Sequence, residues 1–111
     1  MTRMATIGGF EQLVLLATLR LGPEAYAVTI RRELEERGGR NVSRGALYTV
    51  LERLESKGLL SSRMGDPLPE RGGRARRYYR VTASGVNRVK SSKDQMVRLW
   101  KGLESVLGKL T

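Results

Sequence analysis

The first apolar stretch of the chain has helical spacing and predicts a helix from about Phe10 to Arg20. Apolar residues occupy nearly every face of this helix, so it needs cover from more than one side. A chain of 111 residues builds only a modest core, and we therefore expect part of the helix to meet a partner subunit. Gly22 and Pro23 end the helix, because glycine suits the position after a helix and proline cannot continue one.

Two amphipathic helices joined by a short glycine-containing link follow. The first extends from about Glu24 to Arg37. The second begins after Ser43, whose hydroxyl can accept a backbone N–H of the next turn, and stops near Lys57 and Gly58. Their spacing is typical of a helix-turn-helix unit. The apolar positions of the two helices are Tyr26, Ile30, Leu34, Leu47, Val50, Leu51 and Leu54.

The remainder of the chain predicts a hairpin and one last helix. Leu59–Met64 and Arg76–Val81 have strand character, and the glycines and prolines between them favour turns. Tyr78 and Tyr79 alternate along the second strand, so we expect one ring in the core and the other outside. Thr82 or Ser84 can cap a helix that we expect to continue to the C-terminus. Its apolar stripe, interrupted at Lys93, is Val86, Val89, Met96, Trp100, Leu103, Leu107 and Leu110.

These elements predict a mainly α fold with a small antiparallel β-hairpin, that is, a winged helix-turn-helix followed by a C-terminal dimerisation helix. We expect residues 1–82 to form the winged-helix domain, with its N-terminal helix also at the dimer interface. Residues 83–111 are then the dimerisation helix, because an isolated helix with an apolar stripe needs a partner.

The charge of the chain points to a polyanionic partner. Lysine and arginine number 21 against 11 acidic residues, a formal net charge of +10. Six arginines and two acids lie between Ser61 and Arg80, at the predicted hairpin. Double-stranded DNA is the leading candidate, with arginines of the hairpin on the phosphate backbone or in the minor groove.

Several classes of function are disfavoured by what the chain lacks. Without cysteine or histidine it has no thiolate nucleophile, no imidazole base and none of the usual zinc ligands. Glu35 and Glu36 are adjacent on a helix and point in different directions, so they form no catalytic pair. We expect no enzyme activity, no cofactor and no metal. The longest apolar run, Leu13 to Thr18, is too short to cross a bilayer, and we expect a cytoplasmic protein.

The predicted third helix presents an outward face of Gly45, Thr49, Glu52 and Ser56, flanked by Arg44 and Tyr48. A helix of this width fits the major groove of DNA. The alternative is an ordinary solvated face, which the neighbouring basic hairpin makes the weaker interpretation.

Five segments carry a resemblance to a known family. They are Phe10-Glu11-Gln12-Leu13-Val14-Leu15-Leu16, Ser43-Arg44-Gly45-Ala46-Leu47-Tyr48, Leu51-Glu52-Arg53-Leu54-Glu55, Lys57-Gly58-Leu59-Leu60, and Arg77-Tyr78-Tyr79-Arg80-Val81-Thr82 with Gly85. Together they resemble the short type of the PadR family of winged-helix regulators. The likeness extends from about Phe10 to Gly85.

The resemblance implies that the third helix enters the major groove, the wing contacts the backbone, and the last helix pairs with the partner's N-terminal region. Thr49 stands where family members often have proline. The implied DNA contacts, joined with those of the charge pattern, are Ser43, Arg44, Gly45, Tyr48, Thr49, Arg71, Arg74, Arg76 and Arg77. The expected dimer interface consists of Phe10, Leu13, Leu16, Val89, Met96, Trp100, Leu103 and Leu107.

The sequence therefore predicts a homodimer that binds a palindromic operator and represses transcription, with recognition helices about 34 Å apart. Some members of the family bind flat aromatic compounds, so Met96 and Trp100 are candidate contacts for a small hydrophobic effector. Simple packing explains them more readily. Two alternatives remain open, a winged-helix adaptor for an acidic protein and peripheral membrane association through the basic last helix. The latter conflicts with a dimer, which would cover that helix, and we expect no membrane partner.

Overall fold

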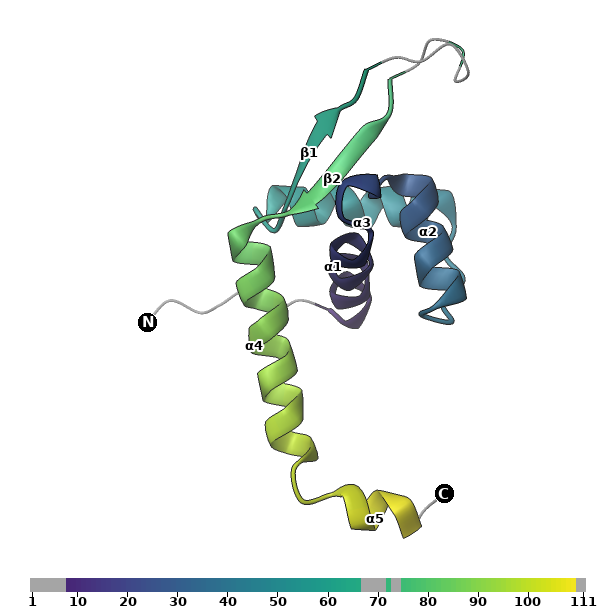
Figure 1. Ribbon diagram of the computed structural model, residues 1–111. Helices are drawn as coiled ribbons and strands as arrows, with labels where there is room; N and C mark the ends of the chain where they lie inside the picture. Colours follow the sequence, from purple (N-terminus) through teal and green to yellow (C-terminus); the bar gives the residue numbers. More distant parts are fainter. Residues whose placement is uncertain (1–7, 67–71, 73–74, 110–111) are drawn as a thin grey trace.

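The computed structural model describes residues 8–66, 72 and 75–109, and its fold is the predicted winged helix with a two-stranded antiparallel hairpin. In Figure 1 the first three helices lie together, the hairpin projects to one side and α4 leads away from them. The elements are α1 (Gly9–Leu21), the 3₁₀ turn η1 (Gly22–Glu24), α2 (Ala27–Glu36), α3 (Arg44–Ser56), β1 (Leu60–Met64), β2 (Arg77–Val81), α4 (Ala83–Trp100) and α5 (Glu104–Lys109).

The core forms where α1 meets the apolar stripes of α2 and α3. Val14 and Leu15 of α1 are completely buried. The predicted stripe of α3 is confirmed, since Leu47, Leu51 and Leu54 are completely buried and Val50 nearly so. This packing leaves the opposite face of α3 in solvent.

The helix ends lie close to the predicted positions. Gly22 follows α1 with a φ of 57°, a conformation that glycine adopts without strain. Ser43 caps α3, because its Oγ accepts a hydrogen bond of 3.1 Å from the backbone N–H of Ala46. Thr82, one of the two predicted caps of α4, accepts a 3.1 Å bond from the N–H of Gly85 and donates to the carbonyl of Gly58 at 2.6 Å. One threonine thereby links the end of α3 to the start of α4.

The hairpin is tied to the helical core along β2. β1 and β2 pair from Leu60 opposite Val81 to Met64 opposite Arg77. The backbone N–H of Tyr79 donates to the carbonyl of Ala25, just before α2, at 2.9 Å. Tyr79 is buried and burial raises its pKa, whereas Tyr78 is only half-buried, so the prediction of one inward ring is confirmed.

The prediction of one unbroken C-terminal helix is wrong. α4 ends at Trp100, and α5 begins only at Glu104. Between them Gly102 has a φ of 88°, which ends a helix, and its N–H donates to the carboxylate of Glu104 at 3.0 Å. Leu103 and Leu107 therefore do not continue the stripe of α4 in a straight line.

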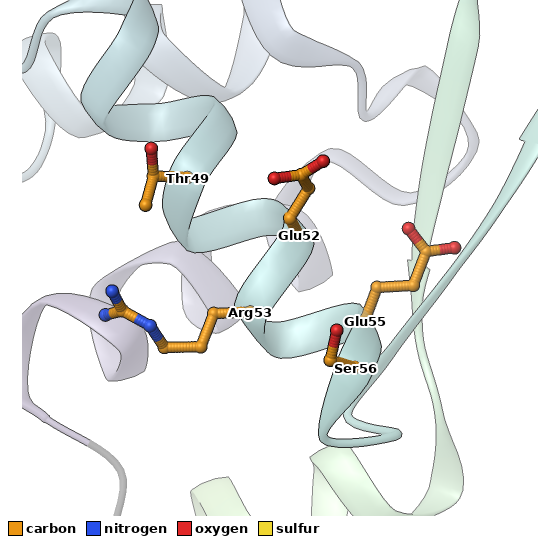
Figure 2. A pocket seen from close by; sticks show the side chains of 5 residues that line it. All are labelled: Thr49, Glu52, Arg53, Glu55 and Ser56. Atoms are coloured by element: carbon orange, nitrogen blue, oxygen red, sulfur yellow. The ribbon is translucent and has the colours of Figure 1, made fainter.

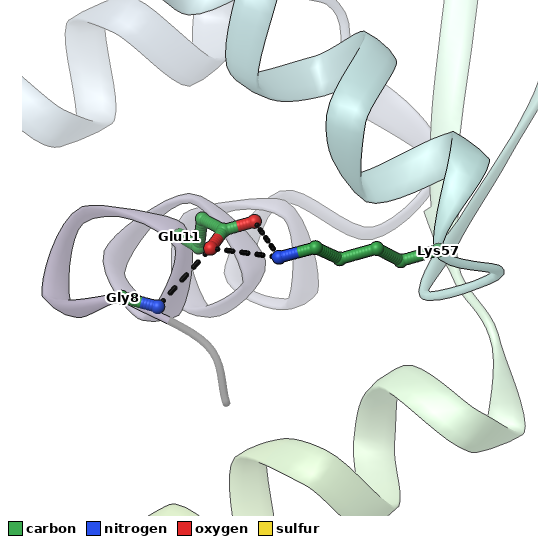
Figure 3. A network of polar contacts seen from close by, with 3 residues as sticks. All are labelled: Gly8, Glu11 and Lys57. Atoms are coloured by element: carbon green, nitrogen blue, oxygen red, sulfur yellow. Dashed lines mark hydrogen bonds and ion pairs between the residues drawn. The ribbon is translucent and has the colours of Figure 1, made fainter. Parts of the chain in front are cut away.

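A partly buried ion pair joins the beginning of α1 to the end of α3 (Figure 3). Nζ of Lys57 lies 2.9 and 3.1 Å from the two carboxylate oxygens of Glu11, which also accepts the N–H of Gly8 at 3.1 Å. Burial alone would raise the pKa of Glu11. The bonds from Lys57 and Gly8 and the charges of Lys57 and Arg53 outweigh burial, so the pKa lies below its ordinary value of 4.5.

Replacing Lys57 with methionine is expected to lower the free energy of unfolding by about 1–3 kcal/mol at neutral pH, because a buried carboxylate loses its partner. A depressed pKa in the folded state stabilises the protein above the unfolded pKa, and this contribution disappears as the pH falls through the folded pKa. The deficit of the variant should therefore be full at neutral pH and shrink as the pH falls to well below the ordinary glutamate pKa of 4.5. Urea unfolding across this range, with Lys90→Met as the exposed control, measures it. An equal deficit at every pH would contradict the assignment.

Candidate nucleic-acid interface

The outer face of α3 is open to solvent along its whole length. Gly45, Thr49, Glu52 and Ser56 are all exposed, as predicted, and Tyr48 beside them is 42% exposed. A side chain added at Gly45 would meet no atom within 4 Å, so a ligand could approach the backbone there closely. This face has the width and the exposure that the major groove requires.

A cleft of about 690 Å³ separates this face from the base of the hairpin. The start of α2 forms one wall, Arg44 and Tyr48 of α3 form a second, and Arg76 and Arg77 form the third. The first backbone N–H groups of α2 lie at the same end, where a helix attracts anions. Three arginines and a helix N-terminus make the cleft suitable for phosphate groups.

Arginine and tyrosine side chains stack at the base of the hairpin. The guanidinium of Arg76 lies 3.9 Å from the ring centre of Tyr26, and that of Arg63 lies 4.8 Å from the ring centre of Tyr78. The two tyrosine rings meet edge to face with their centres 5.7 Å apart. These contacts hold Arg76 beside the start of α2, so its position is fixed before any ligand binds.

A second set of contacts ties Arg77 toward α3. Its NH1 group donates to Oγ of Ser62 at 2.9 Å, and the same Oγ donates to a carboxylate oxygen of Glu55 at 2.6 Å. Glu55 is thus engaged with the hairpin. In Figure 2 its side chain points toward the strands, while Arg53 extends away from both glutamates.

Most of the predicted DNA contacts lie on one side of the molecule. Arg44, Tyr48, Arg76 and Arg77 line the same cleft, and Gly45 and Thr49 lie on the adjoining face. Ser43 is exposed at the start of α3, with its hydroxyl used as the cap. Arg71 and Arg74 fall outside the described residues.

Three residues of the cleft and the hairpin were not predicted as part of the site from the sequence, namely Tyr26, Val28 and Ser62. Tyr26 was predicted only as part of the apolar stripe of α2, yet its ring stacks against the guanidinium of Arg76 and lines the cleft. Val28 is 49% exposed on the wall formed by α2. An apolar residue on the polar side of an amphipathic helix was the available signal for Val28. No signal was available for Ser62, whose role depends on residues distant in the sequence.

The predicted dimer residues gather elsewhere, around a groove of about 880 Å³ between α1 and α4. Met96 is 61% exposed and Trp100 is 51% exposed, and Leu16 of α1 is also open. Oε1 of Gln12, which lines the groove, is buried without a hydrogen-bond partner among the described residues. Val89 is already buried in the chain's own core, while Leu103 and Leu107 lie beyond the end of α4.

Two other kinds of feature, a metal site and a membrane-spanning helix, are absent from the part of the chain that the structure describes. No group of three or more acidic residues is placed to hold a metal ion there. Among the helices described, none combines the length and the apolar character that a membrane-spanning helix needs.

Comparison with known proteins gives a consistent result. The family model of the "Transcriptional regulator PadR-like family" matches residues 15–91. The fold is similar to a PadR family transcriptional regulator of Eggerthella lenta, with a TM-score of 0.67 and 31% identity over 86% of this chain and 81% of that one. A PadR-like transcription factor of Bacteroides fragilis gives a TM-score of 0.65 and 28% identity over 92% and 89% of the two chains. A transcriptional regulator of Mycobacterium tuberculosis is 45% identical over 64 residues, which is 56% of this chain and 53% of that protein.

Proposed function

Because this chain belongs to the PadR-like family of transcriptional regulators, and so is a DNA-binding regulator and not an enzyme, we propose that it binds a palindromic operator as a homodimer and represses transcription. The outer face of α3 enters the major groove, and the hairpin follows the backbone. The observation that carries this proposal is the basic cleft of Arg44, Arg76 and Arg77 beside the exposed face of α3. Fluorescence anisotropy with duplex DNA over a range of salt concentrations tests it.

We assign the second copy of the chain to the groove between α1 and α4. The large side chains Met96 and Trp100 are more than half exposed in a single chain and Leu16 is 39% exposed, and apolar area of this kind favours association. A partner can also supply a donor to Oε1 of Gln12, which a single chain leaves without one among its described residues. In this arrangement residues 1–82 bind DNA, and residues 83–111 hold the two copies together.

A small hydrophobic effector at Met96 and Trp100 stays a prediction. The same two side chains are the ones that a partner subunit covers, so a dimer accounts for their character without a ligand.

Arg76→Ala is expected to weaken binding to all DNA sequences by roughly tenfold and to reduce the slope of log affinity against log salt by about one. The reason is that Arg76 is held at the cleft by Tyr26 and neutralises a phosphate without reading a base. Anisotropy titrations with an operator and with an unrelated duplex, at several salt concentrations, measure both effects.

Arg32→Ala serves as the matched control, because it removes the same charge from an exposed position of α2 that does not line the cleft. An equal loss in both variants would mean that the net charge of the chain, and not the cleft, governs binding.

A further inference from the structure

One acidic group on the outer face of α3, Glu52, has no hydrogen-bond or ion-pair partner among the described residues. Its side chain is exposed. Its neighbour Glu55 is bound to Ser62, and Arg53 points away from it (Figure 2). A free carboxylate near DNA phosphates opposes binding unless it meets a donor. Because Glu52 lies on the outer face of α3, which we propose enters the major groove, its carboxylate needs a hydrogen-bond donor on the DNA.

The major groove offers such a donor at one base in particular. Cytosine presents its N4 amino group there, which glutamate accepts, whereas guanine presents two acceptors and thymine presents one. Adenine places an acceptor, N7, beside its amino group. A carboxylate at Glu52 therefore favours cytosine and rejects guanine and thymine.

Thr49 lies one turn before Glu52 on the same exposed face. Its hydroxyl donates to the carbonyl of Gly45 at 3.0 Å, so the hydroxyl proton is already used inside the helix. The hydroxyl oxygen can then only accept a hydrogen bond, and the γ-methyl is the apolar group open to contact, which suits the C5 methyl of thymine. Three residues of α-helix advance about 4.5 Å, somewhat more than the roughly 3.4 Å between stacked base pairs, so the two side chains can reach neighbouring pairs.

We propose that Glu52 and Thr49 form a reading pair that selects a cytosine and a thymine at neighbouring positions of each operator half-site. This inference rests on the proposed function, and specifically on α3 entering the major groove. It adds the identity of the bases read, which the charge of the cleft cannot supply.

Selection of bound duplexes from a randomised pool tests the role of Glu52. The wild-type chain should enrich a half-site with one cytosine, and Glu52→Gln should replace that cytosine with adenine, because glutamine bonds N6 and N7 of adenine. The affinity ratio between the two sites should change by at least about tenfold. Glu35→Gln, at an exposed position of α2 outside the cleft and outside the outer face of α3, should keep the wild-type selection.

The ratio between two sites is measured within each variant, since the loss of one negative charge also strengthens binding to every sequence. Thermal unfolding checks that each variant is folded. If Glu52→Gln keeps the wild-type selection, the reading pair is wrong while the proposed function stands. If the wild-type chain enriches no site at all, the proposed function itself fails.

Deoxyuridine tests Thr49 separately, because it lacks only the methyl group of thymine. Replacing the selected thymine with deoxyuridine should weaken wild-type binding by about three- to tenfold. Thr49→Ser keeps the hydroxyl and loses the methyl, so this variant should bind both duplexes equally. A wild-type chain that is indifferent to the methyl group would overturn the role of Thr49.

Discussion

Replacing Met96 and Trp100 together with glutamate is expected to separate the dimer into folded monomers and to weaken operator binding by at least about 100-fold. Both side chains are more than half exposed in the single chain, so the change removes little packing from the monomer. In the proposed dimer, two carboxylates would be buried in an apolar interface without partners. Sedimentation equilibrium gives the association state, and anisotropy with an operator gives the loss of affinity.

The matched control is the pair Asn87→Glu and Ser91→Glu. These residues lie on the exposed surface of α4 and do not line the groove, and the change adds the same charge to the same helix. The control should remain dimeric and lose affinity only modestly. If it dissociates as readily as the first variant, electrostatic repulsion explains the result, and the assigned interface is wrong.

Gly85→Ala is expected to reduce the free energy of unfolding by about 3 kcal/mol, a large effect for one added carbon. A Cβ at this position would lie 2.3 Å from the carbonyl oxygen of Leu59 and 2.6 Å from a methyl group of Val81. The nearest atom of Leu59 is a backbone oxygen and not the end of a flexible side chain, so the end of α3, the hairpin or α4 must shift to admit the new atom. Thermal or urea unfolding monitored by circular dichroism measures the loss.

Gly45→Ala makes the contrasting variant, because Gly45 also lies in the first turn of a helix but has open space around it. Alanine there should stabilise the fold by up to about 1 kcal/mol, since it favours helix more than glycine does. The same methyl group would obstruct the approach of DNA, so a more stable protein that binds its operator less tightly is expected. Equal destabilisation by both substitutions would contradict the packing described at Gly85.

The sequence was informative where the determinants are local. Ser43 and Thr82 cap helices because of their own side chains, and Gly22 ends α1 because of its own backbone freedom. The buried stripe of α3 followed from its periodicity. The end of α4 was missed although Gly102 could have indicated it. Apolar residues keep a helical spacing beyond that glycine, and the periodicity masked the break.

Contacts between residues far apart in the sequence could not be predicted from local patterns. Lys57 and Glu11 are 46 positions apart, and neither has a local pattern that marks an ion pair. The stack of Arg76 on Tyr26 depends on how the hairpin sits against α2, which only the tertiary structure defines. Seven of the nine predicted DNA contacts are described by the structure, while Arg71 and Arg74 are not. For these seven residues the sequence predicted where they lie and that they reach the surface, while their contact with DNA stays a prediction.

The two hydrogen bonds made by the hydroxyl of Thr82 have a mechanical consequence. Because its hydroxyl bonds both the carbonyl of Gly58 and the N–H of Gly85, we expect a tilt of α4 to be passed on to the end of α3. The 18 residues of α4 form an arm about 27 Å long, so a tilt of about 5° moves its far end by about 2 Å. In the proposed dimer, we therefore expect the angle at which the two α4 arms cross to influence the distance between the two α3 helices, and so the spacing of the operator half-sites that fit.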